Sequence, residues 1–156
     1  MNKTILGLDQ KASDNLVEEL NGLLANFQIY YQNLRGLHWN IKGKNFFELH
    51  VKFEEFYTDS QIKIDEIAER ILTLQGTPLH TFEDYLAKAT VSVGKNISKD
   101  VDAIELVVNS LSELLKNERK ILDLAGEAED EGTNSMMSDF IAEQEKTIWM
   151  LNSWLG

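Results

Sequence analysis

Apolar residues recur along the first part of the chain at steps of four and three, which is the repeat of an amphipathic helix. Between Ser13 and His38 they fall at Leu16, Leu20, Leu23, Phe27, Tyr30, Leu34 and Leu37. Gly43, in the segment NIKGKN that follows, suits a helix stop and a turn. The pattern therefore predicts one long helix that is followed by a reversal of the chain.

A second stripe with the same repeat predicts a helix from about Phe46 to Gln75, a range without glycine or proline. Its apolar positions are Leu49, Phe53, Phe56, Ile64, Ile67, Ile71 and Leu74. Gly76 and Pro78 follow, and both residue types are common just beyond the end of a helix.

The rest of the chain predicts a short helix and two more long ones. Thr81 is placed to cap the short helix FEDYLAKA, and residues 91–97 are expected to form a loop. Ser98 is expected to cap the third long helix, and the fourth is expected from about Asn134 to Trp154, beyond the acidic segment GEAEDEG. The stripes of these two helices are Val101, Ile104, Val108, Leu111, Leu115 and Leu122, and Met137, Ile141, Ile148 and Leu151.

Four long amphipathic helices with a short helix in the longer second connection predict an all-α, ferritin-like four-helix bundle. The length of 156 residues fits a single domain over residues 1–156. The chain has no cysteine, so disulfides and thiolate chemistry are excluded. No apolar run approaches the roughly 20 residues of a membrane span, and the N-terminus lacks a signal-peptide core. We therefore expect a soluble, cytoplasmic protein without a membrane partner.

The charge balance is acidic, with 15 basic and 26 acidic residues and a net charge of −11. Such a chain attracts hard cations and repels DNA. The usual di-metal centre of a ferritin-like bundle needs Glu-x-x-His on two helices, and this chain has none. The positions three before its histidines hold Arg35, Phe47 and Thr77. An ordinary ferritin or bacterioferritin centre inside one subunit is therefore not expected.

Another set of metal ligands is available on the second helix. Asp65 and Glu69 are four residues apart, so their carboxylates share a helix face. His50 lies 15 residues before Asp65, which is about 22 Å along a helix that rises ~1.5 Å per residue. One metal ion cannot bridge that distance within one straight helix.

Two copies of this helix, packed antiparallel about a two-fold axis, would bring His50 of one subunit to Asp65 and Glu69 of the other. His38 would join His50 once the turn at Gly43 reverses the chain. The spacing alone leaves the alternatives open, which are histidines that cap helices or lie on the surface and carboxylates on a solvated helix face.

The residues LHWN around His38, then His50, and then DEIAERI around Asp65 and Glu69 resemble the Dps family of mini-ferritins over nearly the whole chain. The resemblance implies a hollow shell of twelve subunits that oxidises Fe(II) to Fe(III) and stores ferric mineral. Its oxidant is hydrogen peroxide, which the family commonly prefers, or dioxygen. It implies catalytic metal ligands at His38 and His50 of one subunit and at Asp65 and Glu69 of its partner. Glu54, one turn after His50, falls where many members have an acid that assists the second metal position.

The resemblance also implies an acidic pore for iron near the junction of the third and fourth helices, although many relatives have an acid where this chain has Ser135. The candidate pore residues are Glu127, Glu129, Asp130, Glu131 and Asp139. DNA-binding members carry a lysine-rich arm, whereas the segment before the first helix has one lysine and the fourth helix runs to the C-terminus. DNA binding is therefore not expected, and the alternative function is a non-enzymatic, DNA-protecting shell.

Overall fold

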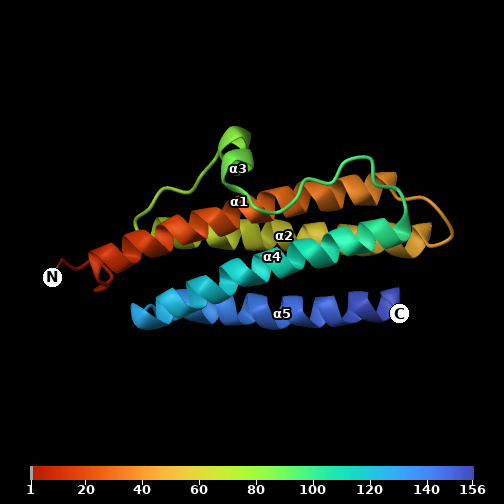
Figure 1. Ribbon diagram of the computed structural model, residues 1–156. Coiled ribbons are helices and arrows are strands. Elements are labelled where there is room, and N and C mark those ends of the chain that lie inside the picture. The colour runs from red at the N-terminus through yellow and green to blue at the C-terminus, as the bar shows by residue number, and fades with distance from the viewer. Residues whose placement is uncertain (1) are drawn as a thin grey trace.

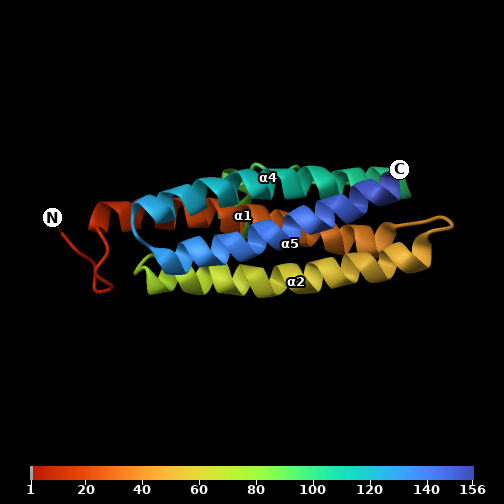
Figure 2. The same cartoon turned by 90° about the horizontal axis from the view of Figure 1, so that it is seen from below.

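The computed structural model describes residues 2–156 and shows five helices, as predicted (Figure 1). Their bounds are α1 Gln10–Asn40, α2 Phe46–Thr73, α3 Phe82–Lys88, α4 Asp100–Glu127 and α5 Glu131–Leu155. α1 packs against α2 and α4, and α4 packs against α5, so the four long helices form one bundle (Figure 2). Within residues 2–156, no helix combines the length and apolar character that a membrane crossing requires.

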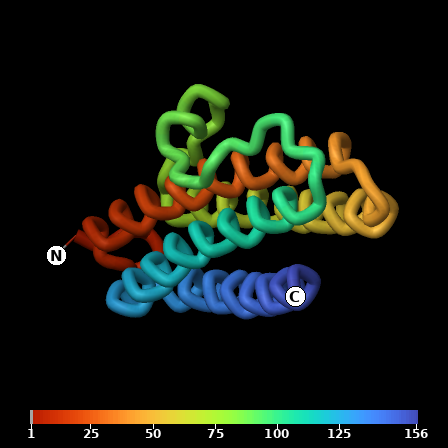
Figure 3. Tube along the Cα trace, turned by 45° about the vertical axis from the view of Figure 1, so that its right-hand side comes forward, coloured from red at the N-terminus to blue at the C-terminus, as the bar shows by residue number. Residues whose placement is uncertain are grey.

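The connection between α2 and α4 runs back along the outside of the bundle and carries α3, which rests on α1 (Figures 1 and 3). Because this connection returns to the end where α2 began, α2 and α4 point the same way. This arrangement confirms the predicted all-α, ferritin-like four-helix bundle with a short helix in its second connection.

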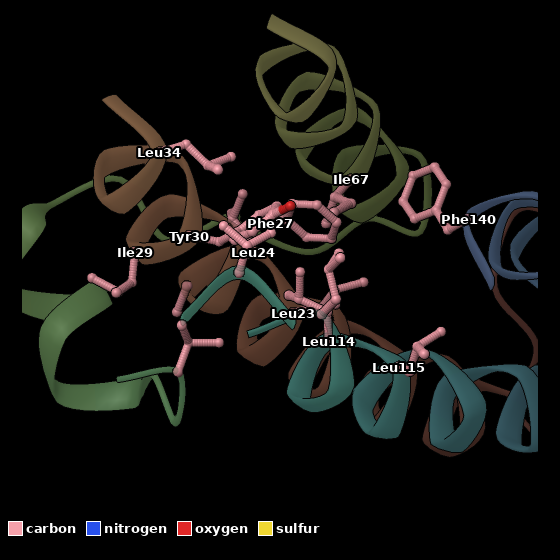
Figure 4. Packing of buried hydrophobic residues seen from close by; sticks show 14 of the residues in the cluster. Leu23, Leu24, Phe27, Ile29, Tyr30, Leu34, Ile67, Leu114, Leu115 and Phe140 are labelled. Carbon is pink, nitrogen blue, oxygen red and sulfur yellow. The ribbon is translucent and has the colours of Figure 1, made fainter. Parts of the chain in front are cut away.

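The predicted apolar stripes face the core, where residues of α1, α2, α4 and α5 meet (Figure 4). All seven stripe positions of α1 are buried. The prediction for α4 is wrong at Val101, which is 46% exposed. The buried face of α4 is rotated toward Ile104, Leu111, Glu118 and Ala125, four positions at seven-residue steps. Because the charged Glu118 lies on the buried face, the apolar pattern in the sequence did not show where that face lies.

The end of α2 differs from the prediction in an informative way. The helix ends at Thr73, and Gln75 adopts the left-handed conformation with φ of 69°. The amide of Gly76 donates to the carbonyl of Ile71 at 2.9 Å, which closes the last turn. A side chain at Gly76 would meet Val17 of α1 at 2.5 Å. This glycine is therefore required for the close approach of the turn to α1.

Helix α2 begins at Phe46 as predicted, whereas the starts of α4 and α5 differ from the prediction. Thr81 does cap α3, since its hydroxyl accepts from the Asp84 amide at 3.1 Å. Ser98 does not cap α4, which begins at Asp100. The carbonyl of Ser98 instead accepts a hydrogen bond from the Lys42 amide at 2.9 Å and so holds the α1–α2 turn. α5 begins at Glu131, three residues before Asn134, because Asp130 caps it.

Three buried asparagines of α1 hold the long connection in place, a role that no sequence pattern predicted. Asn21 accepts from the Leu79 amide at 2.8 Å, and Asn33 accepts from the Gly94 amide at 2.9 Å. Asn26 accepts from the amides of residues 90 and 91, at 2.7 and 3.0 Å. A side-chain amide can both donate and accept, so it satisfies backbone groups that have no helix or sheet partner.

Candidate metal centre

The turn between α1 and α2 places the rings of His38 and His50 face to face, as the reversal at Gly43 predicts. The ring centroids are 3.8 Å apart and the planes differ by 11°. Nδ1 of His38 lies 2.6 Å from the carbonyl oxygen of His50, and Nδ1 of His50 lies 2.7 Å from that of His38. His38 is in the last turn of α1, where carbonyls have no partner within the helix. Its carbonyl is therefore available to the other histidine.

These reciprocal hydrogen bonds fix where the proton sits on each ring. A carbonyl oxygen only accepts, so each Nδ1 must carry a hydrogen and donate it. A neutral imidazole with its proton on Nδ1 has the lone pair on Nε2, the atom that can bind a metal ion. The carbonyl partners also hold the orientation of both rings. The pair thus presents two oriented metal-binding nitrogen atoms.

Aromatic rings enclose the pair, and one carboxylate lies next to it. Phe46 stacks on His50 with centroids 4.9 Å apart, and the edge of Tyr57 meets His38 at 5.4 Å. His38 is buried, whereas Glu54 is exposed and has Oε1 3.6 Å from Nε2 of His38. The structure therefore brings together three of the five predicted site residues.

Asp65 and Glu69 form a second, separate group farther along α2. Both are exposed. A hydrogen bond with Asp65, and then the charge of Asp65, raises the pKa of Glu69. Glu69 therefore takes up a proton more readily beside Asp65 than it would alone. Among residues 2–156, no group of three or more His, Cys, Asp or Glu side chains is arranged to hold a metal ion. The predicted ligands thus fall into two groups within one subunit, a histidine half-site and a carboxylate half-site, that do not meet.

The face of α2 that carries His50, Asp65 and Glu69 also carries exposed apolar side chains. Phe47, Val51, Ile62 and Leu72 are each more than half exposed. Helical geometry places them on the same side as Asp65 and Glu69. Single exposed apolar residues are ordinary, but a row along one helix face is typical of a surface that another chain covers.

The structure corrects the role of one candidate pore residue. Asp130 is only 3% exposed, and its Oδ1 accepts from Nη2 of Arg70 at 2.6 Å. It also caps α5 through the amide of Thr133 at 3.1 Å. The Asp-x-x-Thr spacing was a visible sign of this cap. Asp130 is thus a buried structural acid, whereas the other candidates, Glu127, Glu129, Glu131 and Asp139, are exposed.

Comparisons with known proteins agree on one family. The ferritin-like domain model matches residues 17–156. An uncharacterized Haemophilus influenzae protein is 47% identical over 98% of this chain and 96% of its own length. The DNA protection during starvation protein of Porphyromonas gingivalis is 43% identical over 96% of this chain and 94% of its own.

The crystal structure of a Dps protein from Vibrio cholerae O1 is similar at a TM-score of 0.98 with 52% sequence identity. The match covers 100% of this chain and 98% of that one. The Vibrio protein is described as a member of a broad superfamily of ferritin-like diiron-carboxylate proteins. From the sequence relatives and the fold together, the chain belongs to the Dps family of the ferritin-like superfamily.

Proposed function

We propose that this protein oxidises Fe(II) to Fe(III) at sites shared between two subunits and stores the ferric product inside a hollow shell. The observation that carries the proposal is the reciprocal histidine pair, which leaves both Nε2 lone pairs available to a metal ion, that of His38 at 3.6 Å from Glu54. The carboxylates of Asp65 and Glu69 supply the remaining ligands from a second subunit. The shell of twelve subunits and the cytoplasmic location remain predictions from the sequence.

An antiparallel pair of α2 helices supports the shared site. His50 and Asp65 lie 15 residues apart on α2. A two-fold axis midway between them therefore places His50 of each copy against Asp65 and Glu69 of the other copy. A two-fold interface is self-complementary, so one such contact creates two equal sites. The apolar row on the same face of α2 supplies surface that this contact would bury.

The ligands suit iron in both oxidation states. Imidazole and carboxylate bind Fe(II) and still accommodate Fe(III). Few protein ligands leave coordination positions open to an oxidant. Two Fe(II) ions each give one electron to hydrogen peroxide, which takes up two protons and leaves as two water molecules. A peroxide molecule reduced in this way releases no hydroxyl radical.

The paired carboxyls add a dependence on pH. Because the hydrogen bond with Asp65 raises the pKa of Glu69, protons compete more strongly with iron for this carboxylate as the pH falls. Iron binding is therefore weaker in acid. The exposed acids Glu127, Glu129, Glu131 and Asp139 raise the local concentration of cations, which supports their proposed part in iron entry.

The test is anaerobic loading with Fe(II), followed by hydrogen peroxide and a record of ferric absorbance. We expect rapid oxidation by the native protein at about two Fe(II) per peroxide, because each iron supplies one of the two electrons. His50→Ala and Asp65→Asn should each slow it at least ~10-fold, because a ligand is lost from every site. His80→Ala is the matched control, since His80 is exposed and belongs to neither half-site. Two variants that form intact shells and oxidise iron like the native protein would show that these residues are not the ligands.

The second candidate function is a non-enzymatic shell that protects DNA, as the name of the Porphyromonas relative suggests. The net charge of −11 per chain argues against it, because phosphate contacts supply most non-specific DNA affinity. We expect no retardation of plasmid DNA in a gel at low salt without magnesium. Retention of the DNA under these conditions would favour the second function, and retention only after adding magnesium would indicate bridging by cations.

A further inference from the structure

A cluster of polar side chains is buried inside the bundle and includes none of the proposed iron ligands. Each of the four long helices contributes one buried member: Tyr30 from α1, Lys63 from α2, Glu118 from α4 and Gln144 from α5. Glu118 is 0% exposed, and Tyr30 lies among the apolar side chains of the core (Figure 4). Buried polar groups are costly unless each finds a partner, so their hydrogen bonds can be accounted for one by one.

Two buried oxygen atoms of the cluster lack a hydrogen-bond partner within residues 2–156. Nε2 of Gln144 donates to Oε2 of Glu118 at 2.9 Å. Oε1 of Glu118 and Oε1 of Gln144 are both buried and have no partner among the described residues. If Glu118 is ionised, both are acceptors and neither can satisfy the other. A proton on Oε1 of Glu118 turns that atom into a donor, and a carboxylic acid can then pair head-on with the amide.

The nearby lysine is already matched by other acids. Nζ of Lys63 lies 2.6 Å from Asp59 and 2.7 Å from Glu143. Burial by itself lowers the pKa of Lys63, but hydrogen bonds to Asp59 and Glu143 outweigh it and raise the pKa. Lys63 therefore stays charged, and two carboxylates other than Glu118 neutralise it.

The remaining surroundings also favour a neutral Glu118. Arg119, the next residue on α4, directs its guanidinium to Glu145 at 2.8 Å. Burial raises the pKa of Glu118 to about 8, although the hydrogen bond from Gln144 and the charges of Lys63 and Arg119 act in the opposite direction. The titratable groups that face the cluster from the packed elements are Tyr30 from α1, Asp59 and Lys63 from α2, Arg119 from α4 and Glu143 from α5.

A small cavity adjoins the cluster on the side of Gln144, and Glu118 itself does not line it. It measures about 40 Å³ and is lined in part by Tyr30, Ser60, Lys63 and Gln144. One water molecule requires about 10–15 Å³ of such a cavity, so this cavity has room for water, and its lining offers polar partners. Lys63 also lines a groove on the surface between α2 and α5. Water in the cavity would thus stand between the buried amide and the groove.

We propose that Glu118 and Gln144 form a buried proton-binding site, in which Glu118 is a neutral carboxylic acid at neutral pH and exchanges its proton with solvent through water in the adjoining cavity. When the proton leaves, a carboxylate oxygen is forced against the amide oxygen of Gln144, and the packing of α4 against α5 weakens. The site is therefore a pH-sensitive element within the subunit, separate from the iron chemistry.

The direction of the pH effect follows from linkage. The pKa of Glu118 is raised above its unfolded value, so the folded state holds this proton more tightly. The stabilisation is complete below the unfolded value of 4.5 and is lost as the pH rises through about 8. Glu118→Gln keeps the shape, supplies an N–H to Oε1 of Gln144 and removes the titration.

The experiment combines infrared spectroscopy with denaturant unfolding of the assembled protein. The native protein should show the carbonyl stretch of a protonated, buried carboxylic acid at neutral pH, and this band should disappear as the pH rises through about 8. Glu118→Gln should lack the band at every pH. The unfolding midpoint of the native protein should fall across the same range, whereas that of Glu118→Gln should stay level.

Glu105→Gln is the matched control, because Glu105 is an exposed glutamate of the same helix. It should keep both the band and the fall in midpoint. The absence of a carboxylic acid band from the native protein at neutral pH would overturn the proposal, and would indicate an ionised Glu118 with a water donor. A native pH profile in Glu118→Gln would overturn it as well. If Glu118→Gln fails to fold, the titration of the band in the native protein decides the question alone.

Discussion

His50→Ala and Asp65→Asn, each expected to oxidise iron slowly alone, are expected to restore rapid iron oxidation when their subunits are assembled together. Each proposed site takes its imidazoles from one subunit and its carboxylates from the other. A dimer that contains one copy of each variant therefore has one site with both defects and one site with none. Random assembly of equal amounts makes half of the dimers mixed, so about a quarter of all sites should be intact.

The measurement is the amplitude of the rapid ferric absorbance change after the two variants are dissociated and reassembled as a mixture. Each variant reassembled by itself controls for the treatment and should still oxidise iron slowly. A double variant mixed equally with native subunits is a second control, because every mixed dimer then contains two damaged sites. If the sites are shared, only dimers of two native subunits stay active, and about a quarter of all sites should be intact. If each site lay within a single subunit, about half of all sites would be intact.

A mixture that still oxidises iron slowly, although size and light scattering show mixed shells, would contradict a site shared across the two-fold axis. It would do so even if the native protein oxidises iron rapidly. The mixing experiment thus tests the geometry of the site, while the single variants test the identity of its ligands.

Asp130→Ala is expected to lower the free energy of unfolding by about 3–5 kcal/mol, because it removes one partner of a buried ion pair. Asp130 joins three parts of the fold at one point. It accepts from Arg70 of α2 at 2.6 Å, from the Thr133 hydroxyl at 2.5 Å and from the Thr133 amide at 3.1 Å. Gly132 leaves room for the guanidinium, since a side chain there would lie 2.6 Å from Arg70.

The measurement is chemical unfolding of Asp130→Ala, Arg70→Ala and the double variant. The double variant should lose less than the sum of the single losses, because it leaves no charge unpaired. Glu55→Ala is the control, since it breaks the exposed pair with Lys52 and should cost less than about 1 kcal/mol. Equal losses for Asp130→Ala and Glu55→Ala would show that the buried pair does not hold α2 to the α4–α5 turn.

The sequence predicted the long helices well because their apolar repeat is set by local geometry. All seven stripe residues of α1 are buried, and the loop expected at 91–97 is present. It predicted helix starts less well, because several nearby residues can cap and the tertiary contacts decide between them. Ser98 serves the α1–α2 turn through its carbonyl, and Asp130 caps α5 in place of a later start at Asn134.

The candidate site divides in the same way. Spacing along the chain was enough to group His38 with His50 and Asp65 with Glu69, and to exclude one metal ion between the two groups within a single helix. Which ring nitrogen of each histidine carries the proton depends on two carbonyls, and only the fold brings those within 2.6 and 2.7 Å. Spacing also gave no indication that Glu118 is the polar residue on the buried face of α4.

The sequence by itself determined the all-α bundle, the reversal at Gly43 and the residue types of the proposed metal ligands, because helical periodicity, turn residues and ligand chemistry are local properties. The tertiary structure alone decided which acids remain available to a cation. Asp130 and Glu118 are buried against Arg70 and Gln144, while Glu54, Asp65 and Glu69 stay exposed on α2. The physical reason is that exposure and hydrogen-bond partners depend on which helices pack together, and residues far apart in the chain supply them.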